Sequence, residues 1–379
     1  MKGDDHSVFR HAIPIGRILG ISIDLDYSWF VVVGLITWIL AVSYFPTQFQ
    51  GWSVGEYWAV GAITAIMLFV SVLIHELGHA VVAQRYGLAV PRITLFLFGG
   101  VSQIAAEPPS AIAEFWIAVV GPVVSLALAA LFWEVEPLTA SWPPLFAVVE
   151  YLAILNLILC IFNLIPGFPL DGGRVLRAIL WRIKGNYQRA TAIAATTGRF
   201  FGFALIFLGV WEALTGAFIN GLWIAFIGWY LESAAGSQLQ QEVLKALVGR
   251  HKVLDAMRRD FPLVPPDLTL QEMVDKYFLA RGSRYLVVSG PAGPTGIVTP
   301  ATVRAVSRSE WPETQASQVT VPLSKLAVTH PETTLWSALE KMGRDGVNQM
   351  PVVDASGVVG ILSRDDILQY LRVLRTLAA

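Results

Sequence analysis

The sequence predicts a polytopic α-helical membrane protein with a soluble C-terminal α/β domain, and two features of its composition indicate this. Of the 379 residues, 55% are hydrophobic and only 15% are charged, whereas soluble globular proteins carry about a quarter charged residues. The charges are also spread unevenly, because residues 1–236 hold 25 of them and the shorter stretch 237–379 holds 30. We therefore expect an apolar membrane region followed by a soluble tail.

Net charge and cysteine content exclude several classes of protein. The formal net charge is −1, so no basic field favours binding to nucleic acid. The single cysteine, Cys160, lies in an apolar run. It excludes an intramolecular disulfide framework and a zinc site built from cysteines.

Six apolar runs in the first 236 residues approach the length of about 20 residues that a helix needs to cross a bilayer. They lie at residues 28–45, 57–83, 111–133, 143–165, 192–214 and 216–233. The first run is longer than the apolar core of a signal peptide, although Ala41-Val42-Ser43 resembles a cleavage site. We expect this run to be retained, which predicts six transmembrane helices.

Basic residues gather in alternate connections between these runs, as they do on the cytoplasmic side of membrane proteins. The basic connections contain Lys2, Arg10 and Arg17; Arg85 and Arg92; and Arg174, Arg177, Arg182, Lys184 and Arg189. The other three connections contain none. We therefore expect both termini, and the tail, on the cytoplasmic side of the cell (inner) membrane.

The tail contains an internal repeat with an offset of about 64 residues. Residues 266–270 align with residues 331–335, and residues 296–299 align with residues 360–363. Each copy predicts a helix, a short β-branched strand, a turn, a second strand and a helix. The expected domains are the membrane region 1–236, a linker 237–250, and the two copies at 251–310 and 311–379.

The second apolar run contains His75-Glu76-Leu77-Gly78-His79. The spacing of four residues places both imidazoles on one face of a helix, with Glu76 beside them, which is the arrangement of helical zinc peptidase sites. Titratable residues inside a membrane helix are rare without a partner or a function. The alternative is a structural polar cluster that binds a neighbouring helix.

A catalytic zinc ion takes three protein ligands and leaves a position for water, so a third ligand is expected at the same membrane depth. Asp171 meets this condition, because it directly follows the fourth run, which ends on the same side as His79. Its segment, residues 163–173, contains two prolines and three glycines, and broken backbone at membrane depth is tolerated where it lines a cavity. Alternatively, Asp171 caps a helix over residues 174–181.

Residues 93–104 predict two short strands around a Gly-Gly turn between the second and third spans. The alternative is a hydrophobic loop packed on the spans. Several other glutamates lie near span ends, where we expect them to face interfacial water: Glu56, Glu114, Glu134, Glu136, Glu150 and Glu212.

The membrane HELGH motif together with Asn163-x-x-Pro-x-x-Pro-Leu-Asp171-Gly-Gly resembles the site-2 protease family of intramembrane zinc metalloproteases. The resemblance covers roughly residues 10–235. It implies one zinc ion held by His75, His79 and Asp171, with Glu76 as the catalytic base. It also implies a substrate-binding or oxyanion-binding role for Asn163, a membrane-dipping hairpin beside the metal, and transmembrane segments as substrates.

The tail resembles a pair of cystathionine-β-synthase-type (CBS) domains, which often bind adenine nucleotides such as ATP or AMP. The second copy has the expected Gly360, Ser363 and Asp366, whereas the first copy has Thr302 in place of the aspartate. The resemblance therefore implies at most one good nucleotide site and a homodimer formed through the pair. Asp366 could equally serve as a helix cap.

The predicted function is a zinc-dependent endopeptidase that cuts transmembrane segments near the cytoplasmic face, with the CBS pair as regulator. The main alternative is a CBS-regulated divalent-metal transporter, since such tails also occur on transporters. A transport path would need polar residues at several depths, whereas the candidates here cluster at one. A further alternative is a non-catalytic sensor, but all the motif residues are present.

Overall fold

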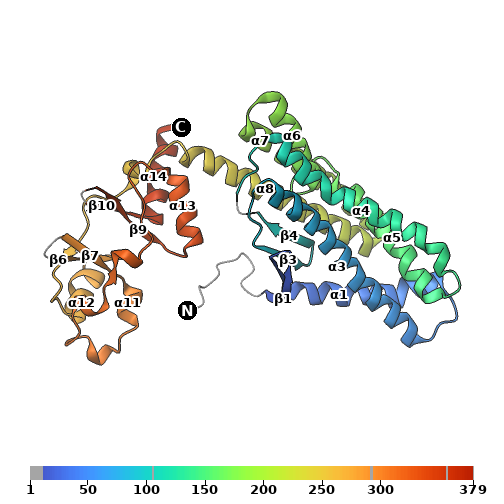
Figure 1. The fold of residues 1–379 in the computed structure, drawn as a ribbon, viewed down its shortest axis with the longest axis horizontal. Helices are drawn as coiled ribbons and strands as arrows, with labels where there is room; N and C mark the ends of the chain where they lie inside the picture. Colours follow the sequence, from blue (N-terminus) through green and yellow to red (C-terminus); the bar gives the residue numbers. More distant parts are fainter. Residues whose placement is uncertain (1–11, 105, 291–292, 356, 379) are drawn as a thin grey trace. The chain divides into compact units, whose positions relative to one another are not determined.

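The computed structural model describes residues 12–104, 106–290, 293–355 and 357–378 (Figure 1). Two compact units are present, a membrane unit that reaches Glu242 and a C-terminal unit that begins at Val243. The boundary falls inside helix α8 (Phe218–Val248), so the expected linker is largely helical. Lys2 and Arg10, which contributed to the topology prediction, lie outside the described residues.

Five helical segments in the described residues are long and apolar enough to cross a membrane. They are α1 (Tyr27–Ile39) continuing through a π-helical turn (Leu40–Tyr44) into α2 (Phe45–Gln48), α3 (Val54–Arg85), α4 (Ala111–Thr139), α5 (Pro143–Asn163) and α7 (Tyr187–Leu214). They confirm a multi-span membrane region. The sixth predicted span lies in the first half of α8, which is not among the five, because Asn220 and Glu232 lower its hydropathy.

The first half of α8 packs closely on α7 through glycines: Gly202 and Gly209 of α7, and Gly221 and Gly228 of α8. A Cβ atom at Gly209 would lie 2.3 Å from the amide nitrogen of Ala225. A Cβ at Gly228 would lie 2.6 Å from that of Ile206. Small residues allow such close approach of backbones in membrane proteins, so glycine is required along this helix pair.

A four-stranded sheet with the order β1-β2-β3-β4 accompanies the helices. Its strands are β1 (Ile13–Ile18), β2 (Ile21–Leu25), β3 (Arg92–Phe96) and β4 (Gly99–Gln103). The predicted hairpin is the antiparallel pair β3–β4. Strand β2 pairs with β3 in parallel, a pairing that the sequence did not predict. Strand β4 is left at the edge of the sheet.

Helix α6 (Asp171–Lys184) occupies most of the connection after α5. Asp171 is the first residue of this helix and Leu170 is its N-cap, so the capping alternative for Asp171 is wrong. The preceding Phe168 is buried against Ala194 and Ala195 of α7. A Cβ at Gly198 would lie 2.0 Å from the carbonyl oxygen of Phe168. The loop that delivers Asp171 is therefore packed tightly on α7.

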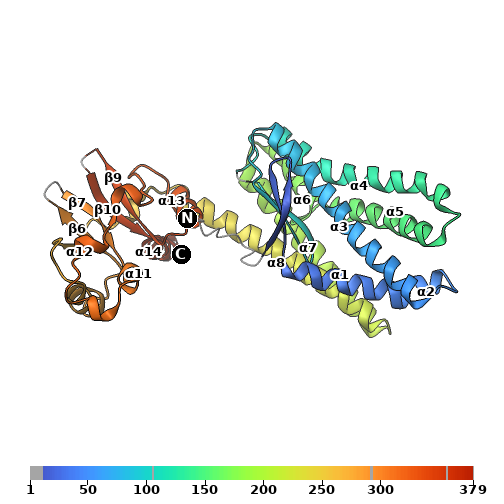
Figure 2. The same cartoon turned by 60° about the horizontal axis from the view of Figure 1, so that its bottom comes forward.

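The C-terminal unit contains two β-hairpins that follow the internal repeat, β6–β7 in the first copy and β9–β10 in the second (Figure 2). Isolated bridges and a shared core of Tyr285, Val287, Ile297 and Ile361 join the copies. The elements are α9 (Val253–Ala256), β5 (Leu263–Val264), α10 (Leu270–Met273) with a π-helical turn (Val274–Leu279), β6 (Leu286–Gly290), β7 (Gly293–Val298), α11 (Pro300–Arg304), a 3-10 turn (Arg308–Glu310), α12 (Ala316–Val319), β8 (Val321–Pro322), a 3-10 turn (Leu323–Lys325), α13 (Leu335–Arg344), β9 (Gln349–Asp354), β10 (Gly357–Ser363) and α14 (Arg364–Ala378).

Candidate metal centre

Helix α3 presents His75 and His79 on one face. A capping box formed by Ser53 and Glu56 starts the helix, and its apolar sequence carries it through 32 residues. Both histidines are only 3% exposed, and their Nε2 atoms lie 3.1 Å apart. The spacing of four residues has therefore brought two nitrogen donors together inside the membrane unit.

Asp171 completes a group of three donors. Its Oδ2 lies 3.1 Å from Nε2 of His75 and 3.1 Å from Nε2 of His79. The candidate ligand atoms of the three residues all lie within 4.8 Å of one another. Two segments about 95 residues apart in sequence thus meet at one site.

Helix α4 contacts both imidazoles at Nδ1, the ring nitrogen that does not face Asp171. Nδ1 of His79 donates to the carbonyl oxygen of Ile117 at 2.6 Å, and Nδ1 of His75 lies 2.8 Å from Oγ of Ser125. Because a carbonyl can only accept, Nδ1 of His79 carries a proton, so Nε2 is the ring nitrogen that can bind a metal. This is the tautomer that a metal-binding histidine requires.

Gly121 allows α4 to pack closely against both imidazoles. A Cβ atom at this position would lie 2.2 Å from Nε2 of His79 and 2.6 Å from Nε2 of His75. Any side chain would therefore overlap the imidazoles and displace them or α4.

The donor set suits zinc. A tetrahedral zinc site with bonds of about 2.0–2.1 Å places neighbouring ligand atoms about 3.3 Å apart, close to the 3.1 Å separations found here. Two imidazoles and one carboxylate are also a common protein ligand set for catalytic zinc. The three side chains could hold a zinc ion with little rearrangement.

Glu76 lies between α3 and the sheet. Oγ of Ser102, on β4, donates to Oε2 of Glu76 at 2.6 Å. A Cβ at Gly100 would lie 2.5 Å from Cγ of Glu76, so a glycine is needed for β4 to lie against this side chain. The hairpin therefore holds the carboxylate of the residue that directly follows His75.

Asn163 is not joined to the donor group by a hydrogen bond. It is the last residue of α5 and is half-buried. Within the described residues its side chain makes no hydrogen bond, so its amide is free to meet another group.

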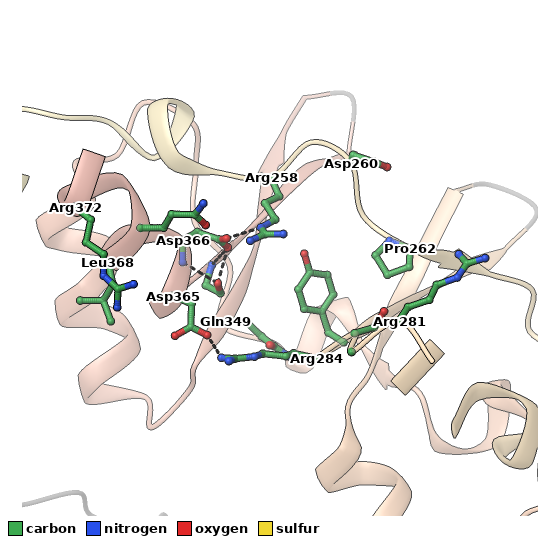
Figure 3. Close-up of a pocket in the computed structure, with 15 residues that line it drawn as sticks. Arg258, Asp260, Pro262, Arg281, Arg284, Gln349, Asp365, Asp366, Leu368 and Arg372 are labelled. Carbon is green, nitrogen blue, oxygen red and sulfur yellow. Dashed lines mark hydrogen bonds and ion pairs between the residues drawn. The ribbon is translucent and has the colours of Figure 1, made fainter. Parts of the chain in front are cut away.

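In the C-terminal unit, a cleft of about 610 Å³ lies between the two copies (Figure 3). Ser363 and Asp366 line this cleft and form a capping box at the start of α14. Ser363 is the N-cap and Asp366 is the third residue of the helix, so the interpretation of Asp366 as the N-cap is wrong. Arg258 donates to the same carboxylate. Gly360 does not line the cleft in the described structure; its Cβ would lie 2.9 Å from Sδ of Met257.

Several residues around the donor group escaped the sequence analysis. The sequence offered a signal for two of them, because Gly121 belongs to a Gly-Pro pair and Ser125 is a serine within an apolar span. It offered no signal for the Ile117 carbonyl or for Ser102. The prediction that Glu114 faces interfacial water is wrong. Glu114 is 0% exposed and pairs with Arg177 of α6, a partner that only the folded chain supplies.

Comparison with known proteins agrees with this geometry. The model of peptidase family M50 matches residues 63–138 and 136–205, and the CBS domain model matches residues 253–308 and 317–373. A Mycobacterium tuberculosis protein named as zinc metalloprotease Rip3 is 38% identical over 371 residues, covering 97% of this chain and 94% of that protein.

Similarity extends to an archaeal sequence and to a solved archaeal structure. Zinc metalloprotease MJ0392 of Methanocaldococcus jannaschii is 30% identical over 373 residues, covering 96% of this chain and 97% of that protein. The solved site-2 protease from Methanocaldococcus jannaschii is 29% identical, with 60% of this chain and 95% of that chain covered and a TM-score of 0.44. The chain therefore belongs to peptidase family M50, as a multi-pass, site-2 protease-like zinc metalloprotease with two C-terminal CBS domains.

Proposed function

We propose that the protein is an intramembrane endopeptidase in which His75, His79 and Asp171 hold one zinc ion and Glu76 is the catalytic base. The observation that supports this most directly is the convergence of two buried histidines and the partly buried Asp171 within 4.8 Å, beside a glutamate held by Ser102. A zinc ion supplies Lewis acidity and lowers the pKa of a coordinated water to about 7.

The side chains around that ion have distinct roles in peptide hydrolysis. Glu76 accepts the proton of the attacking water and returns it to the leaving amide nitrogen. Ser102 donates a hydrogen bond to Oε2 of Glu76, so Oε1 is the oxygen that accepts the proton from the water. Asn163, whose amide is free of hydrogen bonds within the described chain, holds the substrate carbonyl oxygen as negative charge develops on it.

The substrate is a transmembrane segment that unwinds locally before cleavage, because a helix hides its peptide bonds in its own hydrogen bonds. Strand β4 is the edge of the sheet and lies against Glu76. An unwound segment pairs with this edge and so meets the catalytic base. Helix-breaking residues in the substrate promote cleavage.

Cleavage occurs near the cytoplasmic face of the cell (inner) membrane. Arg85 ends α3 close to His79, and Arg182 and Lys184 end the helix that begins with Asp171. Basic residues mark the cytoplasmic side. With the first half of α8 as a sixth span, both termini lie in the cytoplasm.

Glu76→Gln tests the proposal in liposomes with a membrane-anchored model substrate. We expect loss of cleavage, with bound zinc unchanged. Glu134→Gln is the matched control, because Glu134 is exposed on α4 and its side chain makes no hydrogen bond or ion pair within the described residues. Retained cleavage by Glu76→Gln, with loss of divalent-metal flux, would instead support the transporter alternative.

We further propose that the CBS pair regulates the peptidase by binding ATP or AMP in the cleft of Figure 3. Arg258 and Arg284 offer cations for phosphate, and Asp365 and Asp366 lie beside them. Asp366 can bind a ribose only if Arg258 gives way, because the two are paired.

Calorimetric titration of the full chain in detergent tests nucleotide binding. We expect heat of binding that Asp366→Ala removes and that the exposed control Asp267→Ala retains. No heat at millimolar ATP or AMP would rule out this ligand class.

We also propose a homodimer formed through the CBS pair, which rests on the two-copy tail. Sedimentation in detergent should give an average mass that rises toward that of a dimer as the protein concentration increases. A monomer mass at every concentration would contradict it.

A further inference from the structure

Glu114 and Arg177 form an ion pair buried inside the membrane unit. Glu114 lies in the first turn of α4 and is 0% exposed, and the Arg177 side chain, on α6, is 8% exposed. Nε of Arg177 donates to Oε1 of Glu114 at 2.6 Å, and a terminal guanidinium nitrogen donates to the same oxygen. The two residues are 63 positions apart in sequence, and their pair joins α4 to α6.

Two aromatic rings hold the guanidinium in addition. Cζ of Arg177 lies 4.8 Å from the ring centroid of Phe168 and 4.7 Å from that of Tyr187. Phe168 belongs to the loop that delivers Asp171, and Tyr187 begins α7. A cation over two rings is attracted by both. Arg177 therefore contacts three elements at once: the loop before Asp171, the start of α7, and α4.

Helix α4 is also the element that orients both histidines. Ile117 lies one turn after Glu114 and accepts from His79, and Ser125 contacts His75. Asp171 and Arg177 share α6, less than two turns apart. A shift of α6 along α4 would therefore separate Oδ2 of Asp171 from the histidines while leaving the histidines in place.

We infer that Glu114 and Arg177 are positioning residues that set the register of α6 on α4 and so bring Asp171 to the metal; this inference rests on the proposed role of Asp171 as a ligand. An ion pair is suited to this task because a buried charge is costly unless its partner is in place. Oε2 of Glu114 has no hydrogen-bond partner within the described residues. The carboxylate therefore depends on Arg177 alone, and other registers leave it unpaired.

The test compares three changes at the pair with one matched control. Glu114→Gln and Arg177→Lys weaken the pair, and the double variant Glu114→Leu/Arg177→Met replaces both charges by apolar side chains of similar size. Such replacement usually preserves stability, so the double variant remains informative if the single ones fold poorly. The control is Arg199→Lys, in an Arg–Glu pair between α7 and α8 whose arginine is 41% exposed.

The readouts are zinc affinity, by chelator competition, and the visible spectrum of protein loaded with Co²⁺. We expect zinc binding to weaken about 10–100-fold in the variants of the pair, with an altered Co²⁺ spectrum and a lower kcat at unchanged KM. The folded double variant should show the same loss, and the Arg199→Lys control should match the wild type.

Wild-type zinc affinity and Co²⁺ spectrum in the folded double variant would overturn the inference, as would an equal loss in Arg199→Lys. The variant Asp171→Ala shows which hypothesis is wrong, the positioning role of the ion pair or the assignment of Asp171 as a ligand. If Asp171→Ala weakens zinc binding and the double variant does not, only the positioning role is refuted. If Asp171→Ala binds zinc normally, the ligand assignment itself is wrong.

Discussion

Substitution of Gly121 by alanine should weaken zinc binding more than about 100-fold without disrupting the rest of the fold. The added Cβ would lie 2.2 Å from Nε2 and 2.4 Å from Cε1 of His79, and 2.6 Å from Nε2 of His75. Non-bonded carbon and nitrogen atoms need about 3.5 Å, so the overlap with His79 is about 1.3 Å. Either the imidazoles rotate or α4 moves away from α3 by about 1 Å.

Both responses damage the metal centre. Movement of α4 stretches the 2.6 Å contact between His79 and Ile117 and the 2.8 Å contact between His75 and Ser125. Loss of one such supporting contact weakens metal binding about 10–100-fold, so loss of both predicts a decrease beyond about 100-fold. Overpacking of this kind costs about 1–3 kcal/mol of stability, which a multi-span protein can tolerate.

The assay is zinc stoichiometry and affinity of the purified protein in detergent, followed by cleavage of a model substrate. The matched control is Gly34→Ala, because Gly34 lies in α1 and a Cβ there meets nothing within 4 Å. We expect the control to bind zinc and cleave normally. If Gly121→Ala bound zinc with wild-type affinity, the assigned position of the metal between His75, His79 and Asp171 would be refuted.

Three further predictions concern other parts of the molecule. Ser102→Ala removes the 2.6 Å hydrogen bond to Glu76 and should lower kcat about tenfold with zinc content unchanged; steady-state kinetics with an unaltered kcat would exclude an orienting role. Removal of zinc by a chelator should lower the thermal unfolding midpoint of the wild type, because ligand at 100 times its Kd stabilises the folded state by about 2.7 kcal/mol; the midpoint of Asp171→Ala should not respond. In the C-terminal unit, burial, and secondly Asp366, raise the pKa of Tyr285 to about 12 from 10.0. The neutral phenol therefore contributes stability that is complete below pH 10 and is lost as the pH rises through 12; chemical denaturation of wild type and Tyr285→Phe over this range should show a smaller loss in the variant.

The membrane helices were predictable because an apolar run is a local property of the chain. The run 57–83 became α3 and the run 143–165 became α5, with ends shifted by only a few residues. The sheet was predictable only in part. Strands β3 and β4 adjoin in sequence, whereas the parallel pairing of Ser22 with Arg92 joins distant segments and leaves no local signal.

Taken by itself, the sequence determined the chemistry of the candidate site. The spacing of His75 and His79 defines one helical face, and a titratable cluster inside an apolar span is too costly to lack a partner or a function. Only the tertiary structure decided what surrounds those groups, because each surrounding contact comes from a segment distant in the chain. The approach of Asp171, the close packing of Gly121 on the histidines and the burial of Glu114 against Arg177 all depend on how α4 and α6 pack.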